Sequence, residues 1–325
     1  MANLKTDFVG LTLKSPIIAG SSGLTADMNE LVDIEKSGAG AVVLKSIFEE
    51  QIIMETERTI EFSDFPTQED YIREYVKANN LQQYIELIKE AKSRLTIPVI
   101  ASINCVKDGE WLDYAAKIEA AGADALELNI FTLNLDEFKE SKEIEEEYFN
   151  ILRHLKKVVN IPLVIKISNQ FTNLTAFVSK LHALGASAVT LFNRFYEPDI
   201  DIRTLRVESA SVFSMPEDLR IPLRWTGILS AKEPKLQISA STGVHDGGAV
   251  VKMLLAGATT VQVCSAMYEN GISVIEFMNK FLNDWMEKQS FNTISEFRGK
   301  LSYSSINNAV RYERAQFMKY FSSRK

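Results

Sequence analysis

The sequence has few of the residues that build disulfide or zinc frameworks. Among 325 residues there are only two cysteines, Cys105 and Cys264, and they lie far apart without the spacing of metal ligands. Disulfide-stabilised domains and zinc modules need several cysteines at short, regular spacings. We therefore expect a chain that folds in a reducing compartment, without disulfides and without a metal centre.

Long hydrophobic runs are also absent. No uninterrupted apolar stretch reaches the roughly 18 residues that suggest a membrane-spanning helix. The first residues, MANLKTDFVGLTLKSP, contain no apolar run of signal-peptide length. The sequence alone therefore predicts a cytoplasmic protein without a membrane span.

Positive charge is in deficit. The chain has 36 lysines and arginines against 43 aspartates and glutamates, which gives a formal net charge of −7. Such a balance disfavours binding to nucleic acids or to anionic membranes. We expect the partner to be a small molecule instead.

One connection does recur in this otherwise ordinary globular composition, which is 46% hydrophobic and 24% charged. In each copy a glycine ends a helix in the left-handed conformation, small residues turn, and a buried strand begins. The four copies are SGAGAVVL (37–44), AGADALEL (121–128), LGASAVTL (184–191) and AGATTVQV (256–263). Four copies of one connection predict a repeated strand–helix architecture.

Eight short apolar strands alternate with helical segments along the chain. The predicted strands are 16–21, 41–46, 98–104, 125–130, 162–168, 188–193, 236–241 and 259–265. Their near-continuous hydrophobicity favours an α/β fold with a closed parallel sheet, the (β/α)8 TIM barrel, as a single domain over 1–325. A doubly wound open sheet is the alternative, and the eight-fold count weighs against it.

Segments outside this alternation have separate predictions. Residues 6–14 are expected to form a hairpin that turns at Gly10 and closes the bottom of the barrel. Residues 272–325 are expected to be an amphipathic helical extension packed on its outside. Three long connections interrupt the alternation: 47–68, the loop after the fourth strand, and 194–215. Residues 47–68 have no clear period and are interpreted as an active-site loop or a strand pair.

The stretch Leu236–Gly271 reads as strand, glycine turn, helix, strand and a second turn. Backbone N–H groups at Gly243 and at Cys264–Ser265 are expected to converge on an anion, aided by a helix dipole. This predicts a phosphate cradle. His245 follows the first turn and is interpreted as a surface or capping residue.

Polar residues stand at the carboxyl ends of several predicted strands, where barrels of this kind carry their function. Leaving a buried polar group unpaired costs about 1–3 kcal/mol, so a ligand is expected to satisfy them. They include Lys45, Asn104, Asn129, Lys166 and Asn193. The two lysines have two functional interpretations: a Schiff-base nucleophile, or cations that stabilise negative charge on a reduced cofactor ring. A structural ion pair inside the barrel is the non-functional alternative for each.

These motifs resemble the dihydroorotate dehydrogenases, and most of all their soluble class 1 branch, whose members are FMN-containing (β/α)8 barrels. The similarity runs almost end to end. It includes DFVGLTLKSPIIAGSSGL, GAGAVVLKS, IPVIASIN, GADALELNI, IPLVIKIS and STGVHDGGAVVKMLLAGATTVQVCSAMYENG. Each motif alone is weak, but together they are specific.

The resemblance implies FMN as cofactor and assigns roles by position. The implied cofactor-binding residues are Ala19, Gly20, Ser21, Lys45, Ser46, Asn104, Asn129, Lys166, Gly243, Cys264 and Ser265. In this assignment Lys166 stabilises the reduced flavin, and the last three bind its phosphate through backbone amides. The implied substrate-binding residues are Asn129, Asn134 and Asn193.

Three segments depart from the family pattern. The family loop after the fourth strand reads Asn-Leu-Ser-Cys-Pro-Asn with cysteine as general base, whereas here Thr132 stands between Asn129 and Asn134. The membrane-bound branch uses serine there, so Thr132 is the candidate base, and a turn residue without a catalytic role is the other interpretation. Residues 47–80 contain no match to the family's substrate loop, and Val212–Ser214 replace a glycine pair.

The resemblance predicts an FMN-dependent oxidoreductase of pyrimidine biosynthesis that oxidises dihydroorotate or a related CH–CH substrate. Thr132, Lys166 and Lys45 are its candidate catalytic residues. It further implies a soluble electron acceptor and a homodimer. Two alternatives stay open: a Schiff-base aldolase or lyase acting on a phosphorylated substrate, and a flavin-binding paralogue with reduced catalysis.

Overall fold

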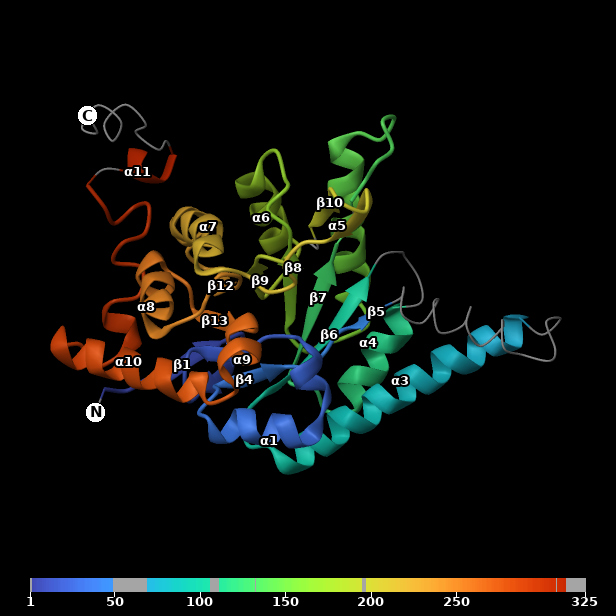
Figure 1. Ribbon diagram of the computed structural model, residues 1–325, viewed down its shortest axis with the longest axis horizontal. Helices are drawn as coiled ribbons and strands as arrows, with labels where there is room; N and C mark the ends of the chain where they lie inside the picture. The colour runs from blue at the N-terminus through green and yellow to red at the C-terminus, as the bar shows by residue number, and fades with distance from the viewer. Residues whose placement is uncertain are drawn as a thin grey trace.

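Eight parallel strands form a closed barrel in the computed structural model, which describes residues 2–48, 69–105, 111–131, 133–194, 197–307 and 309–313 (Figure 1). The barrel strands, in order around it, are β3 (Ile17–Ala19), β4 (Ala41–Val43), β6 (Val99–Cys105), β7 (Ala125–Ile130), β8 (Leu163–Ile167), β9 (Ala188–Leu191), β12 (Gln237–Ala240) and β13 (Thr260–Val263). β13 pairs in parallel with β3, Val261 opposite Ile17, which closes the sheet. The predicted TIM barrel is confirmed, and the open-sheet alternative is wrong.

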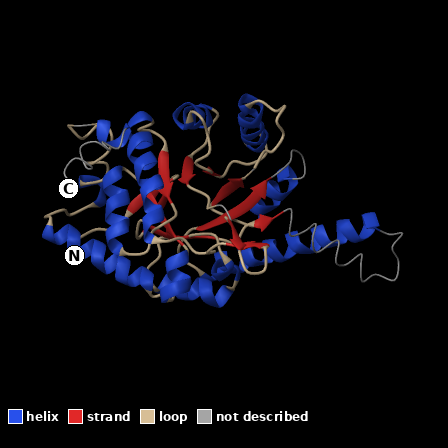
Figure 2. Cartoon of the chain, turned by 45° about the horizontal axis from the view of Figure 1, so that its top comes forward, coloured by secondary structure: helices blue, strands red, loops and turns tan. Residues whose placement is uncertain are grey.

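Helices alternate with the strands and surround the barrel (Figure 2). They are α1 (Met28–Lys36), α3 (Glu69–Arg94), α4 (Trp111–Ala120), α5 (Ser141–Leu155), α6 (Leu174–Ala183), α7 (Arg220–Lys232) and α8 (Gly247–Ala256), followed by α9 (Ser265–Asn270) and α10 (Val274–Lys288). Of these, α3 is one continuous helix of 26 residues.

The repeated glycine connection has the predicted conformation in all four copies. Gly38, Gly122, Gly185 and Gly257 have φ values of 90°, 97°, 96° and 118°. Glycine adopts this left-handed region without the clash that a Cβ atom causes there. Each helix therefore ends abruptly and the chain turns directly into the next strand.

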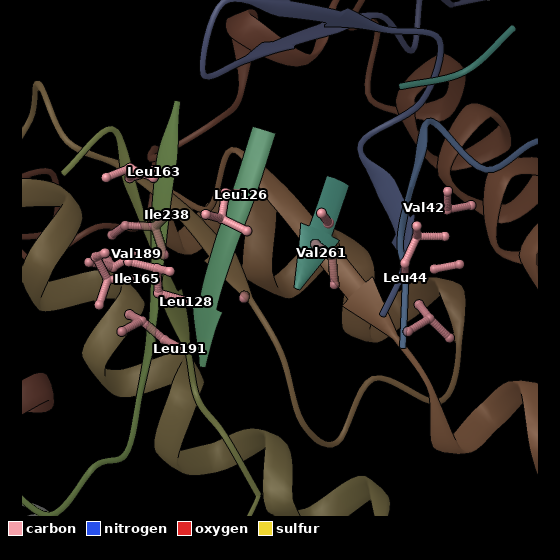
Figure 3. Close-up of a cluster of buried hydrophobic side chains, with 14 of the residues drawn as sticks. Val42, Leu44, Leu126, Leu128, Leu163, Ile165, Val189, Leu191, Ile238 and Val261 are labelled. Carbon is pink, nitrogen blue, oxygen red and sulfur yellow. The ribbon is translucent and has the colours of Figure 1, made fainter. Parts of the chain in front are cut away.

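The barrel strands bury both of their faces, because successive side chains point to opposite sides of a strand. Leu126 and Leu128 of β7 and Val189 of β9 belong to the hydrophobic cluster that the strands share with the helices (Figure 3). Ile88 of α3 and Phe177 of α6 are fully buried parts of the same cluster. This layer fixes the helices on the barrel.

A separate, smaller cluster fills the bottom of the barrel interior. Phe8 and Leu13 come from the N-terminal hairpin β1 (Thr6–Phe8) and β2 (Leu11–Leu13), and they pack on inward-facing Ile100, Ala125 and Val164. Both hairpin side chains are almost fully buried. The predicted hairpin therefore closes this end of the barrel.

Two predicted connections contain more structure than expected. The short strand β5 (Ile47–Phe48) extends the sheet beside the end of β6. The stretch 194–215, expected to be a loop, contains the antiparallel hairpin β10 (Pro198–Asp201) and β11 (Arg206–Ser209). Almost all of its residues are exposed, so no burial pattern marked it in the sequence.

The C-terminal extension is only partly helical within the described residues. α10 packs on α8, as expected of an amphipathic helix. The chain then follows α8 and α7 through backbone hydrogen bonds from Gly299 to Leu254 and from Tyr303 to Gly227. Beyond these contacts lies the short helix α11 (Val310–Glu313).

Candidate active site

The inward-facing positions change from apolar to polar along each strand. On β7 the series is Ala125, Glu127 and Asn129, and β6 and β8 contribute Asn104 and Lys166. Asn104 is the register partner of Asn129, and Asn129 is the partner of Lys166. Three predicted site residues therefore lie at one level of the barrel, near the carboxyl ends of their strands.

Lys166 forms an ion pair with Glu127 inside the barrel. The Lys166 Nζ atom lies 3.5 Å from Glu127 Oε1, with side-chain exposures of 12% and 1%. Removing one partner of a buried pair is strongly destabilising because it leaves an uncompensated charge. Glu127 therefore holds the Lys166 ammonium group at a fixed place in the site.

The second oxygen of this carboxylate is also engaged. Thr190 Oγ1 donates to Glu127 Oε2 at 2.8 Å, and Gln262 Nε2 donates to it at 2.7 Å. The sequence interpretation missed this network. The sequence did contain a signal for it. Glu127 and Gln262 stand inside otherwise apolar strands, at positions whose side chains point into the barrel.

The asparagines also come together. Asn193 Nδ2 donates to Asn129 Oδ1 at 2.7 Å. Asn104 Oδ1 and Asn134 Nδ2 are buried without a hydrogen-bond partner in the described part of the chain. Since buried polar groups are nearly always paired, these two atoms indicate a ligand that supplies the partners.

Serines line the wall beside the first two strands. Ser21 Oγ lies 3.1 Å from Ser46 Oγ, which in turn lies 2.7 Å from Ser102 Oγ. Gly20 N–H donates to the carbonyl of Val263 at 2.8 Å, and the Ala19 side chain belongs to the outer cluster. Of Ala19, only the backbone is therefore left to contact a ligand.

A cavity of about 190 Å³ connects these groups to the predicted cradle. Six of the predicted site residues are among those that line it: Ser21, Lys166, Asn193, Gly243, Cys264 and Ser265. A second hollow of about 430 Å³ shares Asn193 and Arg194 with it and extends to Leu133 and Pro198 of the surrounding loops. Lys45 follows β4 and is half-buried.

The turn after β12 has a backbone that only glycine suits. Gly243 has a φ of 76°, and a Cβ atom built there would lie 2.2 Å from the Leu219 nitrogen. Its N–H points to Ser214 Oγ at 3.4 Å, and Ser214 N–H donates to Ser265 Oγ at 2.9 Å. The two predicted turns therefore lie side by side, with hydroxyl groups between them.

Cys264 takes part through its position in this turn. Burial raises the pKa of the Cys264 thiol, and the nearby Lys166 ammonium opposes that effect only in part. A thiol with a raised pKa is a poor nucleophile at neutral pH. The geometry therefore agrees with a contribution from the Cys264 backbone rather than from its side chain.

The prediction that His245 is a surface or capping residue is wrong. The cap of α8 is Asp246, whose Oδ1 accepts from Ala249 N–H at 2.7 Å. The His245 side chain is only 10% exposed and lies between Glu269 and Ser214. The small turn residues of the cradle leave room for the ring to point inward.

Part of the predicted site lies outside the described residues. Thr132 is one such residue, and so are residues 49–68 of the loop after β4. Asn134 is described, and its Oδ1 accepts from Asp136 N–H at 3.0 Å.

The described ranges contain no helix long and apolar enough to span a membrane. Within the same ranges, no group of three His, Cys, Asp or Glu residues is arranged to hold a metal ion.

Comparisons with known proteins agree with this geometry. A sequence model of the family Dihydroorotate dehydrogenase matches residues 3–286. The dihydroorotate dehydrogenase B (NAD(+)) catalytic subunit of Thermoplasma acidophilum is 26% identical over 305 residues, covering 92% of this chain and 99% of that protein. The same subunit of Pyrococcus furiosus is 27% identical over 308 residues, covering 91% and 98%. The chain, with its closed barrel and its lysine and asparagines at the strand ends, belongs to the dihydroorotate dehydrogenase family.

Proposed function

We propose that the protein is an FMN-dependent oxidoreductase that oxidises dihydroorotate or a related CH–CH substrate in pyrimidine biosynthesis. The observation that carries the proposal is the Lys166 ammonium group, paired with buried Glu127 in the wall of a cavity. The Gly243 turn lines the same cavity. A cation and an anion cradle in one cavity match the polar ring and the phosphate of a flavin mononucleotide.

The residues of the cavity fit FMN. The cradle offers the hydroxyl groups of Ser214 and Ser265 to a phosphate, beside the Gly243 N–H that contacts Ser214 Oγ at 3.4 Å. Asn104 does not line the cavity, but it is the register partner of Asn129, and its unpaired amide oxygen offers an acceptor to the polar edge of a flavin or to its ribityl chain. Bound FMN would supply hydride-accepting chemistry, which no side chain of the chain can provide.

The protein's own groups have distinct roles in this proposal. Lys166 stabilises negative charge that develops beside it, and Lys45 adds a second cation at the mouth of the barrel. Asn129, Asn193 and Asn134 orient the substrate through their amides. Thr132 is the proposed acceptor of the substrate proton, in a loop that includes Asn134.

The ion pair argues against the alternative of a Schiff-base aldolase. A Schiff base forms on a free amine, whereas the Lys166 nitrogen lies 3.5 Å from the buried Glu127 carboxylate, which holds it in an ion pair. Treatment with borohydride in the presence of phosphorylated carbonyl substrates should therefore leave the protein mass unchanged. A trapped adduct on Lys166 or Lys45 would revive the aldolase.

The decisive test is a visible spectrum of the purified protein before and after anaerobic addition of dihydroorotate. We expect a yellow protein that bleaches. A colourless protein that fails to take up FMN would refute the cofactor proposal. Colour without bleaching by any dihydropyrimidine would favour a flavin-binding paralogue with reduced catalysis.

A threonine variant tests the base. General-base catalysis contributes about 10²–10⁴-fold to rate, so Thr132→Ala should slow flavin bleaching by about that factor at neutral pH. Thr132→Ser should retain much of the rate because it keeps the hydroxyl group. Unchanged bleaching in the alanine variant would move the base elsewhere.

We also propose that the protein works in the cytoplasm as a homodimer that passes electrons to a soluble acceptor. The two relatives are catalytic subunits by name, which supports electron transfer to a partner subunit or a small acceptor. Sedimentation equilibrium of the purified protein measures the mass: about twice the chain mass supports the dimer, and a single chain mass contradicts it.

A further inference from the structure

Three side chains form a connected line behind the cradle. Glu269 of α9 lies 3.1 Å from His245 Nδ1, and His245 Nε2 lies 3.1 Å from Ser214 Oγ. Ser214 Oγ then accepts from the Gly243 N–H at 3.4 Å and donates to Ser265 Oγ at 3.1 Å. Ser214 and Ser265 line the cavity, whereas His245 reaches it through Ser214.

The direction of these hydrogen bonds depends on what occupies the cradle. Because Nδ1 faces a carboxylate, it carries a hydrogen atom whether the ring is neutral or charged. In the neutral ring Nε2 is then an acceptor, which competes with Ser265 Oγ for the single hydroxyl proton of Ser214. In the charged ring Nε2 is a donor, and the Ser214 proton is free to point into the cradle.

A phosphate group has only acceptor oxygens when fully ionised. Ser214 can donate to such an anion and keep its hydrogen bond to His245 only if His245 donates to Ser214, which requires a proton on both ring nitrogens when Nδ1 already carries one. A cationic ring behind the hydroxyl also offsets the charge of the anion. Binding of the anion and protonation of His245 should therefore favour each other.

We propose that Glu269, His245 and Ser214 form a proton-coupled clamp for the phosphate of the flavin nucleotide. The inference rests on the proposed function for the identity of the nucleotide. When the phosphate binds at the cradle, His245 takes up one proton from solvent. His245 is a positioning residue here, and Ser214 is the group that contacts the anion.

Other charged groups near the clamp have their own partners. The Asp246 carboxylate caps α8. Asp218, on the 3-10 turn Pro216–Leu219 packed against Gly243, accepts from Met215 N–H and lies 3.8 Å from Arg194 Nε. Lys166 lines the same cavity and is paired with Glu127. Glu269 is the carboxylate that faces the His245 ring directly.

Titration of the full-length apoprotein with FMN and with riboflavin, followed by flavin fluorescence, tests the clamp. The second ionisation of a phosphate monoester lies near pH 6, so the charge of FMN is constant between pH 7 and pH 9. A histidine ordinarily changes charge between about pH 5 and 8. We expect the Kd for FMN to rise at least about fivefold between pH 7 and pH 9, with a limiting slope of one decade per pH unit for one coupled proton.

Riboflavin lacks the phosphate, so its Kd should stay constant over the same range. His245→Gln places a permanent donor behind Ser214 and should bind FMN with a nearly flat pH profile. His245→Leu removes the donor behind Ser214, and Ser214→Ala removes the hydroxyl group itself. Both variants should bind FMN weakly at every pH and bind riboflavin with an unchanged Kd.

His182→Gln is the matched control, because His182 also pairs with a carboxylate, Glu233 at 2.9 Å, but lies on α6. It should behave as the wild type.

An FMN profile that is as steep in His245→Gln as in the wild type would overturn the clamp and leave the flavin function intact. Equal pH dependence for FMN and riboflavin would overturn it as well. If neither flavin binds, the proposed function fails instead, and inorganic phosphate becomes the probe. The clamp would then be supported if phosphate raises the Tm of the wild type more at pH 7 than at pH 9, but raises the Tm of His245→Gln equally at both. Equal stabilisation by phosphate at both pH values in both proteins would refute the clamp.

Discussion

The two halves of the barrel interior differ in what their side chains do. The lower half is apolar and closed by Phe8 and Leu13 of the hairpin, so burial there stabilises the fold. The upper half holds Glu127, Lys166 and asparagines, whose burial costs free energy unless each group is paired. The chain keeps that polar half at the end where a ligand can supply the missing partners.

The largest effect is expected from breaking the ion pair in the upper half. Lys166→Met keeps most of the side-chain volume but leaves Glu127 buried and unpaired. We expect a loss of about 3–5 kcal/mol in unfolding free energy. Dihydroorotate oxidation should fall by about 10²–10³-fold, the usual cost of removing a group that stabilises transition-state charge. Urea unfolding and stopped-flow bleaching measure the two effects.

The double variant Lys166→Met with Glu127→Gln separates these two effects. The neutral amide at position 127 should restore most of the unfolding free energy, because the single variant is destabilised by the buried Glu127 charge without its lysine. It should restore none of the activity. A double variant as unstable as the single one would show that the ion pair itself stabilises the fold, which would contradict the comparison above.

The lower half should respond in the opposite way. Phe8 is 1% exposed, so Phe8→Ala should reduce the unfolding free energy by about 3–5 kcal/mol. Turnover per folded molecule should stay within about twofold of wild type. Phe138→Ala is the control, since Phe138 is 86% exposed and its loss should leave stability unchanged. A strong loss of turnover in folded Phe8→Ala would mean that the two halves are coupled.

A smaller effect is expected at the cradle. Gly243→Ala places a Cβ atom 2.2 Å from the Leu219 nitrogen at a positive φ, so the turn must shift. We expect the Kd for FMN to rise at least about tenfold, equivalent to about 1.4 kcal/mol. Gly271→Ala has a similar φ of 80° but no atom nearer than 4.0 Å, and it should bind FMN normally. Equal weakening in both variants would attribute the effect to backbone strain alone.

The smallest effect is expected at the loop after β7. Asn134→Ser removes the unpaired Nδ2 atom while its hydroxyl can still cap the turn at Asp136. One neutral hydrogen bond is worth about 0.5–1.5 kcal/mol, so KM for dihydroorotate should rise about 3–10-fold with little change in kcat. An unchanged KM would remove Asn134 from the substrate site.

Much of the fold could be predicted because its signals are local. The four glycine connections specify where helices end, and the near-continuous apolar strands specify burial on both faces. The hairpin β10–β11 was missed because nearly all its side chains are exposed, and exposure leaves no hydrophobic pattern to detect.

The candidate site was predictable where it depends on a turn or a strand end. Gly243, Lys166 and Asn193 line one cavity, as expected from the rule that function gathers at the carboxyl ends of the strands. Glu127 and His245 could not be placed in this way. The sequence shows that a residue is polar, but not which distant side chain it will meet.

The sequence by itself determined the barrel and its glycine turns, since these follow from backbone conformation and from burial along single strands. Only the tertiary structure decided the pairing of Glu127 with Thr190 and Gln262, which stand 63 and 135 residues away, and of Ser214 with His245, 31 residues away. Closing the barrel brings inward-facing positions of different strands to one level. Hydrogen bonds between them depend on that register, which no single segment contains.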